Sequence, residues 1–151
     1  MDREILFRAK RKENGEWVQG YLWEGNDSSY IIPRSLRIDY YEKEKRIMAF
    51  ASEVDPETIC QYTGLTDKNG NKIFERDIVN VSFKEARIGA KKEIYPYAVE
   101  FCRSTASFEF VGNDELLGRP CFEVGNQFIM DVIGNIFDNP ELLGAGSNSG
   151  Q

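Results

Sequence analysis

Two Asn-Gly pairs, each set among β-prone residues, constrain the fold of this chain more than any other feature. The first, Asn14-Gly15, separates an alternating run at 5–9 from an aromatic-rich run at 17–23. The second, Asn69-Gly70, is again placed at a hairpin turn. Asn-Gly between two β-prone runs favours a tight hairpin, because a type I′ turn needs φ > 0 at both central positions. We therefore expect short antiparallel hairpins.

The rest of the chain repeats this pattern of short strands and polar turns. The run 30–32 is stopped by Pro33 and is typical of a short or edge strand. Glu75-Arg76-Asp77 is a tight polar corner before another alternating run. Such corners favour a mainly β protein (a β-rich α+β class) with a small bent-sheet or SH3-like barrel core. Further strands are predicted at 78–83, 97–101, 108–111 and 128–133.

Few helices are expected, and all are short. Asp55 is placed to cap one helical turn that starts at Pro56. Asn113 is placed to cap a short helix at 114–117, which Gly118 would end. Residues 42–50 suit a helix and a strand equally, since they mix helix-forming charged residues with β-prone ones.

Length and composition indicate one ordinary globular domain. The chain has 151 residues, with 41% hydrophobic and 29% charged residues. We expect a single domain over 1–143 and a flexible tail over 144–151, where Gly, Ser and Asn dominate. The N-terminus is charged and lacks an apolar segment, and no run is long enough to cross a membrane. These features predict a protein of the cytoplasm.

The absence of histidine removes most familiar catalytic arrangements. A Ser-His-Asp triad and a Cys-His dyad are excluded, and a zinc site would need only Cys and carboxylates. The three cysteines, Cys60, Cys102 and Cys121, form no CxxC pair and are expected to be free thiols. We therefore predict no cofactor, no metal and no enzymatic activity.

Charge weighs against nucleic-acid binding. The net charge is −6, whereas binding to the phosphate backbone normally requires a basic surface. Local basic stretches do occur. One holds Arg8, Lys10, Arg11 and Lys12, although Glu13 and Glu16 dilute it, and a basic loop contains Lys84, Arg87, Lys91 and Lys92.

Three aromatic residues share one face of the expected strand 17–23. Trp17, Tyr21 and Trp23 fall on the same side if the strand is regular, since side chains alternate. They are candidate binding residues, either for a protein partner or for stacking on bases. Burial in the core or in a contact between subunits is the simpler interpretation.

Asp67, Glu75 and Asp77 raise the alternative of a carboxylate cluster for a divalent ion. Carboxylates are also common at turns, where they accept hydrogen bonds from nearby backbone N–H groups. The turn interpretation is favoured, and a metal-dependent enzyme remains the third hypothesis for function.

Three blocks of the sequence resemble the YopX family of small phage and prophage proteins. The central block runs from Gln61-Tyr62-Thr63-Gly64 to Ile78-Val79. It is preceded by Phe7-Arg8-Ala9-Lys10 with Asn14-Gly15-Glu16-Trp17-Val18, and followed by 133–143. Ala9, Cys60 and Arg76 stand where the family often has glycine, which leaves the turn geometry there open.

The resemblance implies a β-rich phage accessory domain and supplies no catalytic residues. Gln61, Tyr62, Asp67 and Asp77 of the central block join Trp17, Tyr21 and Trp23 as candidate binding residues. The first hypothesis is a non-enzymatic module that binds protein, either a phage or host protein or copies of itself as a homo-oligomer. The second is a nucleic-acid-associated factor in phage replication or regulation.

Overall fold

The chain is strand-rich, as expected. The structure is a computed structural model that describes residues 3–34, 50–83, 94–112 and 128–147, and these hold ten β-strands and two short 3₁₀ helices. Every strand pairing whose register the described residues define is antiparallel. The mainly β class is therefore confirmed. Within the described residues, no helix is long and apolar enough to cross a membrane.

The chain divides into two compact units. Unit 1 comprises residues 1–62 and unit 2 comprises residues 63–151. The predicted domain 1–143 thus contains two clusters of contacts. Each unit is described below by itself.

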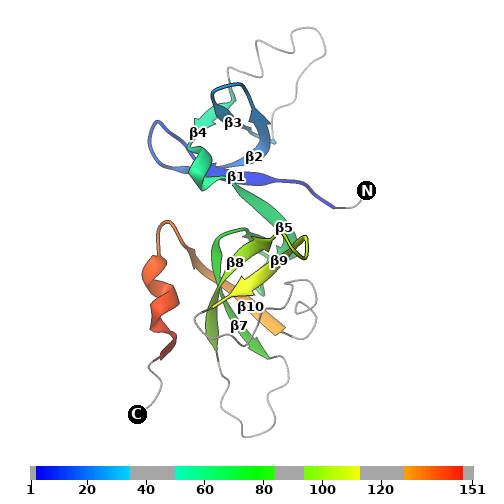
Figure 1. Cartoon of the computed structure of the whole chain (residues 1–151), viewed down its shortest axis with the longest axis vertical. Helices are drawn as coiled ribbons and strands as arrows, with labels where there is room; N and C mark the ends of the chain where they lie inside the picture. The colour runs from blue at the N-terminus through cyan, green and yellow to red at the C-terminus, as the bar shows by residue number, and fades with distance from the viewer. Residues whose placement is uncertain (1–2, 35–49, 84–93, 113–127, 148–151) are drawn as a thin grey trace, which may run out of the picture. The chain divides into compact units, whose positions relative to one another are not determined.

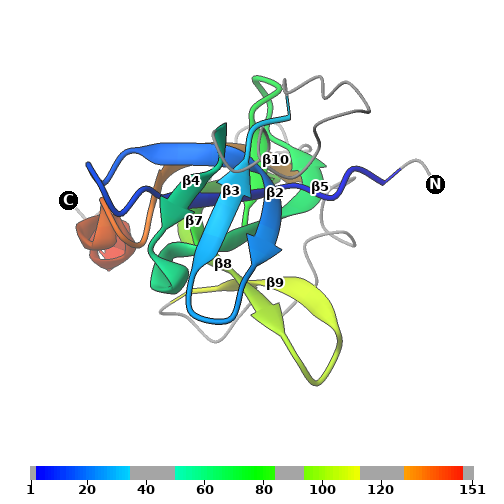
Figure 2. The same cartoon turned by 90° about the horizontal axis from the view of Figure 1, so that it is seen from above.

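Unit 1 is a strongly curled antiparallel sheet (Figures 1 and 2). Its strands follow the order β4-β3-β2-β1, and the start of β5 pairs with β1. The 3₁₀ helix η1 lies between β4 and β5. The bounds are β1 Phe7–Lys10, β2 Trp17–Glu24, β3 Ser29–Ile32, β4 Ser52–Val54, η1 Pro56–Thr58 and β5 Cys60–Thr66.

The curl brings β4 back to the end of β1. An isolated antiparallel bridge joins Arg11 to Val54, and Lys12 N donates to Glu53 O at 3.0 Å. One isolated bridge is not a paired strand. The described strands therefore form bent open sheets, which is one of the two forms predicted. They do not form the other, a closed SH3-like barrel.

The concave side of unit 1 holds its apolar core. Ala9, Ile31 and Val54 are fully buried there, one each from β1, β3 and β4. Strand alternation sends every second side chain of these strands inward, so the intervening side chains face outward. Partly buried Phe7, Val18, Leu22 and Ile59 complete this core.

Unit 2 is built around a second antiparallel sheet of order β10-β7-β8-β9. The end of β5 continues into this unit and pairs with β6. The 3₁₀ helix η3 contacts β8. The bounds are β6 Lys72–Phe74, β7 Asp77–Phe83, β8 Tyr95–Cys102, β9 Ser107–Val111, β10 Phe128–Asn135 and η3 Pro140–Ser147. Its core contains Ile73, Val79, Val81, Tyr97, Val99, Phe110, Phe128 and Met130.

Both Asn-Gly hairpins are confirmed, but the type I′ turn predicted at Asn14-Gly15 is wrong. Only Gly15 has a positive φ there, and Arg11 N donates to Glu16 O across a longer loop. At the second hairpin, Asp67 N donates to Asn71 O, and Gly70 again supplies the positive φ. One left-handed glycine after a type I-like turn is typical of such longer hairpin loops.

Other expectations have mixed outcomes. Asp55 caps η1 and accepts from Glu57 N at 3.1 Å, as predicted. Strand β3 is short, but it lies between β2 and β4 and is not an edge strand. Residues 144–147 belong to η3, although a flexible tail was expected from 144. The predictions for 42–49, 113–117 and the basic loop at 84–92 lie outside the described residues.

The corner between β6 and β7 holds a non-glycine residue in the left-handed region. Arg76 has φ 64°, at the position where a glycine was expected from the resemblance. Its N–H donates to Val99 O at 2.6 Å and its carbonyl accepts from Ile136 N at 3.0 Å. Its guanidinium lies 5.5 Å from the Phe137 ring centroid. Backbone contacts on both sides therefore hold Arg76 in this conformation.

We expect Arg76→Gly to be more stable than Arg76→Ala by about 1 kcal/mol. Both variants lose the guanidinium–ring contact, and only alanine keeps the Cβ that disfavours a left-handed conformation. The measurement is urea unfolding of both variants. Equal stabilities would show that the corner relaxes away from positive φ.

The turn after β10 requires a close approach at Gly134. A Cβ on Gly134 would lie 2.5 Å from Asn139 Oδ1. Asn139 is held in place because its N–H donates to Asn135 O at 2.9 Å. Asn135 Oδ1 accepts in turn from the N–H groups of Phe137 and Asp138.

We expect Gly134→Ala to destabilise the protein by about 1–3 kcal/mol, because the new methyl group overlaps the Asn139 side chain. In a protein that already carries Asn139→Ala, Gly134→Ala should lower the free energy of unfolding by less, because the amide that the new methyl group overlaps is absent. Thermal unfolding of the two single variants and the double variant gives the coupling. Additive effects would contradict this steric account.

Candidate functional site

The convex side of the unit 1 sheet carries an aromatic surface. Trp17, Tyr21 and Trp23 alternate with the inward-facing residues of β2, as the strand pattern predicted. Tyr21 is 49% and Trp23 is 45% exposed, so of the two alternatives, burial in the core and burial in a subunit contact, the first is wrong for these two residues. We call this surface the outer face; its residues are Arg8, Lys10, Trp17, Gln19, Tyr21, Trp23, Tyr30 and Ile32.

One end of the outer face is purely aromatic and aliphatic. Trp23 is opposite Tyr30 in the β2–β3 register, and their ring centroids lie 5.4 Å apart in a tilted arrangement. Tyr21 is opposite Ile32 in the same register. We call these four residues the aromatic end. The paired sheet fixes the spacing of the backbone positions that carry these four side chains.

The other end of the outer face combines a tryptophan with two cations. The Arg8 guanidinium lies 4.7 Å from the Trp17 ring centroid, and Lys10 Nζ lies 5.5 Å from it. The β1–β2 register explains this contact, because Lys10 is opposite Trp17 and Arg8 is opposite Gln19. We call Arg8, Lys10, Trp17 and Gln19 the cationic end.

Neighbouring cations of the same basic stretch have carboxylate partners. Lys12 Nζ lies 2.7 Å from Glu53 Oε1, and Arg11 lies 3.7 Å from Glu16 Oε2. The Glu53 hydrogen bond raises the pKa of Lys12. Arg11 and Lys12 thus each face a carboxylate.

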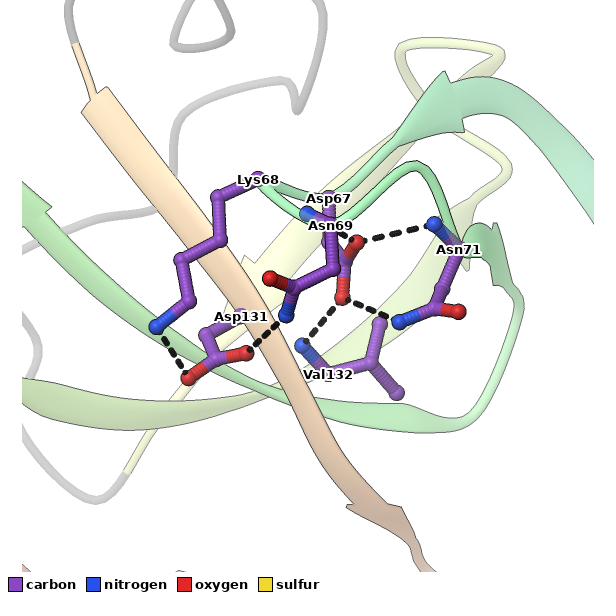
Figure 3. A network of polar contacts seen from close by, with 6 residues as sticks. All are labelled: Asp67, Lys68, Asn69, Asn71, Asp131 and Val132. Carbon is purple, nitrogen blue, oxygen red and sulfur yellow. Dashed lines mark hydrogen bonds and ion pairs between the residues drawn. The ribbon is translucent and has the colours of Figure 1, made fainter.

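Asp67 organises the tip of the β5–β6 hairpin in unit 2 (Figure 3). Its Oδ1 accepts from Asn69 N at 2.8 Å and from Asn71 N at 2.9 Å. Its Oδ2 accepts from Asn71 Nδ2 at 3.0 Å and from Val132 N at 3.2 Å. Asp67 is 6% exposed, so its carboxylate is buried and its hydrogen bonds stabilise the turn.

The same tip docks onto β10, which lies at an edge of the unit 2 sheet. Lys68 N donates to Met130 O at 2.9 Å, and Lys68 Nζ lies 2.7 Å from Asp131 Oδ2. Asn69 Nδ2 donates to Asp131 Oδ1 at 3.3 Å. The hairpin tip therefore occupies backbone groups of an edge strand that could otherwise pair with another chain.

Asp77 also has a structural role. It is 1% exposed, and its Oδ2 accepts from Phe74 N at 2.7 Å across the corner before β7. The hypothesised cluster of Asp67, Glu75 and Asp77 does not form. Across the described residues, which include all three, no group of three His, Cys, Asp or Glu side chains is placed to hold a metal ion.

The remaining predicted residues belong to the scaffold. Tyr62 is 6% exposed in β5, and its N–H donates to Leu6 O at 2.8 Å. Gln61 is half-buried and pairs with Phe7. Cys60 and Cys102 are free thiols, as expected, and Cys121 lies outside the described residues.

Sequence reasoning missed five members of the outer face: Arg8, Lys10, Gln19, Tyr30 and Ile32. Arg8 and Lys10 were interpreted as part of a solvated strand end, and Tyr30 as part of a short apolar run. The missing information was the strand register, because only cross-strand pairing places Lys10 opposite Trp17 and Tyr30 opposite Trp23.

Together, fold and site define a small β-rich protein that presents an aromatic sheet face and uses its signature carboxylates for structure. The chain matches the sequence model of the YopX protein family over residues 6–144, and it therefore belongs to the YopX family.

A solved structure is also similar to this chain. The crystal structure of protein EF1440 from Enterococcus faecalis has 24% sequence identity and a TM-score of 0.49. The match covers 94% of this chain and 99% of that chain. No functionally curated protein matches the chain.

We expect Asp67→Ala to destabilise the protein by about 2–4 kcal/mol, because it leaves buried N–H donors without an acceptor. Asp131→Asn removes only a half-exposed charge and should cost less than about 1 kcal/mol. Urea unfolding of both variants compares them. A cost for Asp67→Ala no larger than that for Asp131→Asn would contradict the role of the hairpin tip.

Asp67 should also contribute to acid sensitivity. Burial alone raises the pKa of its carboxyl, but hydrogen bonds from Asn71, Asn69 and Val132 together outweigh burial and lower the pKa below the usual 3.8. A lowered folded-state pKa gives stability that is present above pH 4 or so and is lost as pH falls through the folded value. In Asp67→Asn, this pH-dependent contribution to the free energy of unfolding should be absent.

Proposed function

We propose that this chain is a non-enzymatic module that works by binding protein, with a second copy of itself as its first partner. The observation that carries the proposal is the exposure of Tyr21 and Trp23 on a rigid sheet. Exposed aromatic clusters are typical of interaction sites, and aromatic residues are enriched at binding hot spots.

The aromatic end is the contact surface in this proposal. Trp23 and Tyr30 form a preformed pair, and Tyr21 and Ile32 extend it along the sheet. Closed symmetric assembly is the usual outcome when one surface patch binds its own copy. A phage or host protein that binds the same end is the alternative partner.

The non-enzymatic part of the proposal follows from the side chains present. Histidine is absent from the chain, and the buried carboxylates Asp67 and Asp77 accept backbone hydrogen bonds. Membership of the YopX family supports an accessory role encoded by a phage or prophage, in the cytoplasm of a bacterial host.

Light scattering coupled to size-exclusion chromatography tests the proposal. We expect the wild type to form a closed oligomer, and Tyr21→Ser/Trp23→Ser to weaken assembly at least about tenfold, since hot-spot truncations cost about 2 kcal/mol or more. Val111→Ser is the matched control, because Val111 is 49% exposed on β9 of unit 2.

Two results would count against self-association through the aromatic end. One is a monomeric wild type at all concentrations. The other is an oligomer that Tyr21→Ser/Trp23→Ser leaves intact. A loss of assembly in Val111→Ser alone would place the contact on unit 2.

A further inference from the structure

We propose that the cationic end of the outer face binds single-stranded nucleic acid. This inference goes beyond the proposed self-association and uses different residues. Arg8, Lys10, Trp17 and Gln19 supply two positive charges, an indole ring and an amide on adjacent strands. Single-strand binders combine aromatic rings that stack on bases with cations that contact phosphates.

The proposed self-association surface and the proposed nucleic-acid surface lie at opposite ends of β2. Trp17 and Trp23 lie at opposite ends of β2, which corresponds to about 20 Å along a strand. A copy that covers the aromatic end therefore leaves a separate surface around Trp17. Within the sheet, the β1–β2 register holds Lys10 opposite Trp17 and Arg8 opposite Gln19.

The side chains of the cationic end favour an anionic and aromatic ligand. None of the four is aliphatic, whereas the buried centres of protein interfaces are largely apolar. A phosphate fits the two cations, and a base can stack on the indole or on the Arg8 guanidinium plane. A nucleic-acid strand carries both groups in each repeating unit.

The sheet offers little to a peptide at this end. β2 pairs with β1 along Trp17–Gly20 and with β3 along Tyr21–Glu24. A peptide that adds a strand bonds to the edge of a sheet, in the plane of the sheet, so it would leave the two cations and the indole of this face uncovered. A helical peptide needs an apolar groove, and the hollow that begins at Arg11 and Lys12, next to Lys10 in the chain, is lined mainly by polar residues. An acidic peptide would engage only the two charges.

The binding should be weak and sensitive to salt. The net charge of −6 opposes long-range attraction, so contact depends on Arg8 and Lys10. Two phosphate contacts on a single strand predict a log–log salt slope of about −1.4. Affinity should therefore fall about sevenfold between about 50 and about 200 mM salt.

The test uses a fluorescein-labelled strand of about 16 deoxythymidines, at the upper end of single-strand site sizes. Fluorescence anisotropy measures the affinity of the full chain at several salt concentrations.

We expect Lys10→Gln to weaken binding and to reduce the log–log salt slope to about −0.7. Trp17→Ala should weaken binding about fivefold or more. Arg103→Gln, an exposed charge in the β8–β9 turn, is the matched control.

Tryptophan fluorescence locates the contact. The chain has two tryptophans, so Trp23→Phe leaves Trp17 as the sole indole. The strand should quench this emission if bases stack there. Poly-glutamate of equal charge is the competitor, and it should compete weakly and leave the emission unchanged.

Four results would overturn the inference: no binding at low salt by the folded chain, a slope near zero, equal losses in Lys10→Gln and Arg103→Gln, or full competition by poly-glutamate. The last would indicate an acidic protein segment instead.

Light scattering on the same samples separates the two proposals, because a failure of strand binding leaves the oligomeric state unchanged. Circular dichroism checks that each variant is folded.

Discussion

The hydrogen bonds of one buried carboxylate hold together much of unit 2. Asp67 shapes the β5–β6 hairpin tip through its contacts with Asn69 and Asn71. The same carboxylate reaches Val132 on β10, so a local turn and a distant strand share one acceptor. Removing it would release both the turn and the cover over an edge strand. This requirement gives Asp67 a structural reason to lie in a distinctive sequence block.

The signature of the family is thus largely architectural in this chain. Tyr62 is buried in β5, and Asp77 is the acceptor for the corner before β7. At the same corner, Arg76 replaces the glycine that the family often has and is held in the left-handed conformation by two backbone partners. The outer face is different, since its aromatic residues are exposed on a sheet whose other side already carries a complete core. Among the described residues, this exposed aromatic surface is the strongest indication of a binding site.

Several features were predictable because they depend on local physics. The Asn-Gly hairpins, the Asp55 cap and the alternation that places Trp17, Tyr21 and Trp23 on one face all follow from neighbouring residues. The type I′ geometry at Asn14-Gly15 failed because the loop closes between Arg11 and Glu16, so one left-handed glycine is enough. The carboxylate cluster failed because Asp67 and Asp77 accept hydrogen bonds from separate backbone donors near each of them.

The sequence by itself determined the β-rich class, the positions of the hairpins and the family, since turn chemistry and alternation act over a few residues. Tertiary structure alone decided which face of β2 is covered and which neighbours it meets. Lys10 and Trp17 are separated by a loop, and Tyr30 reaches Trp23 across another turn. Asp67 meets Val132 from far along the chain. Register and docking depend on how strands pair and curl, and that information is spread over the whole sheet.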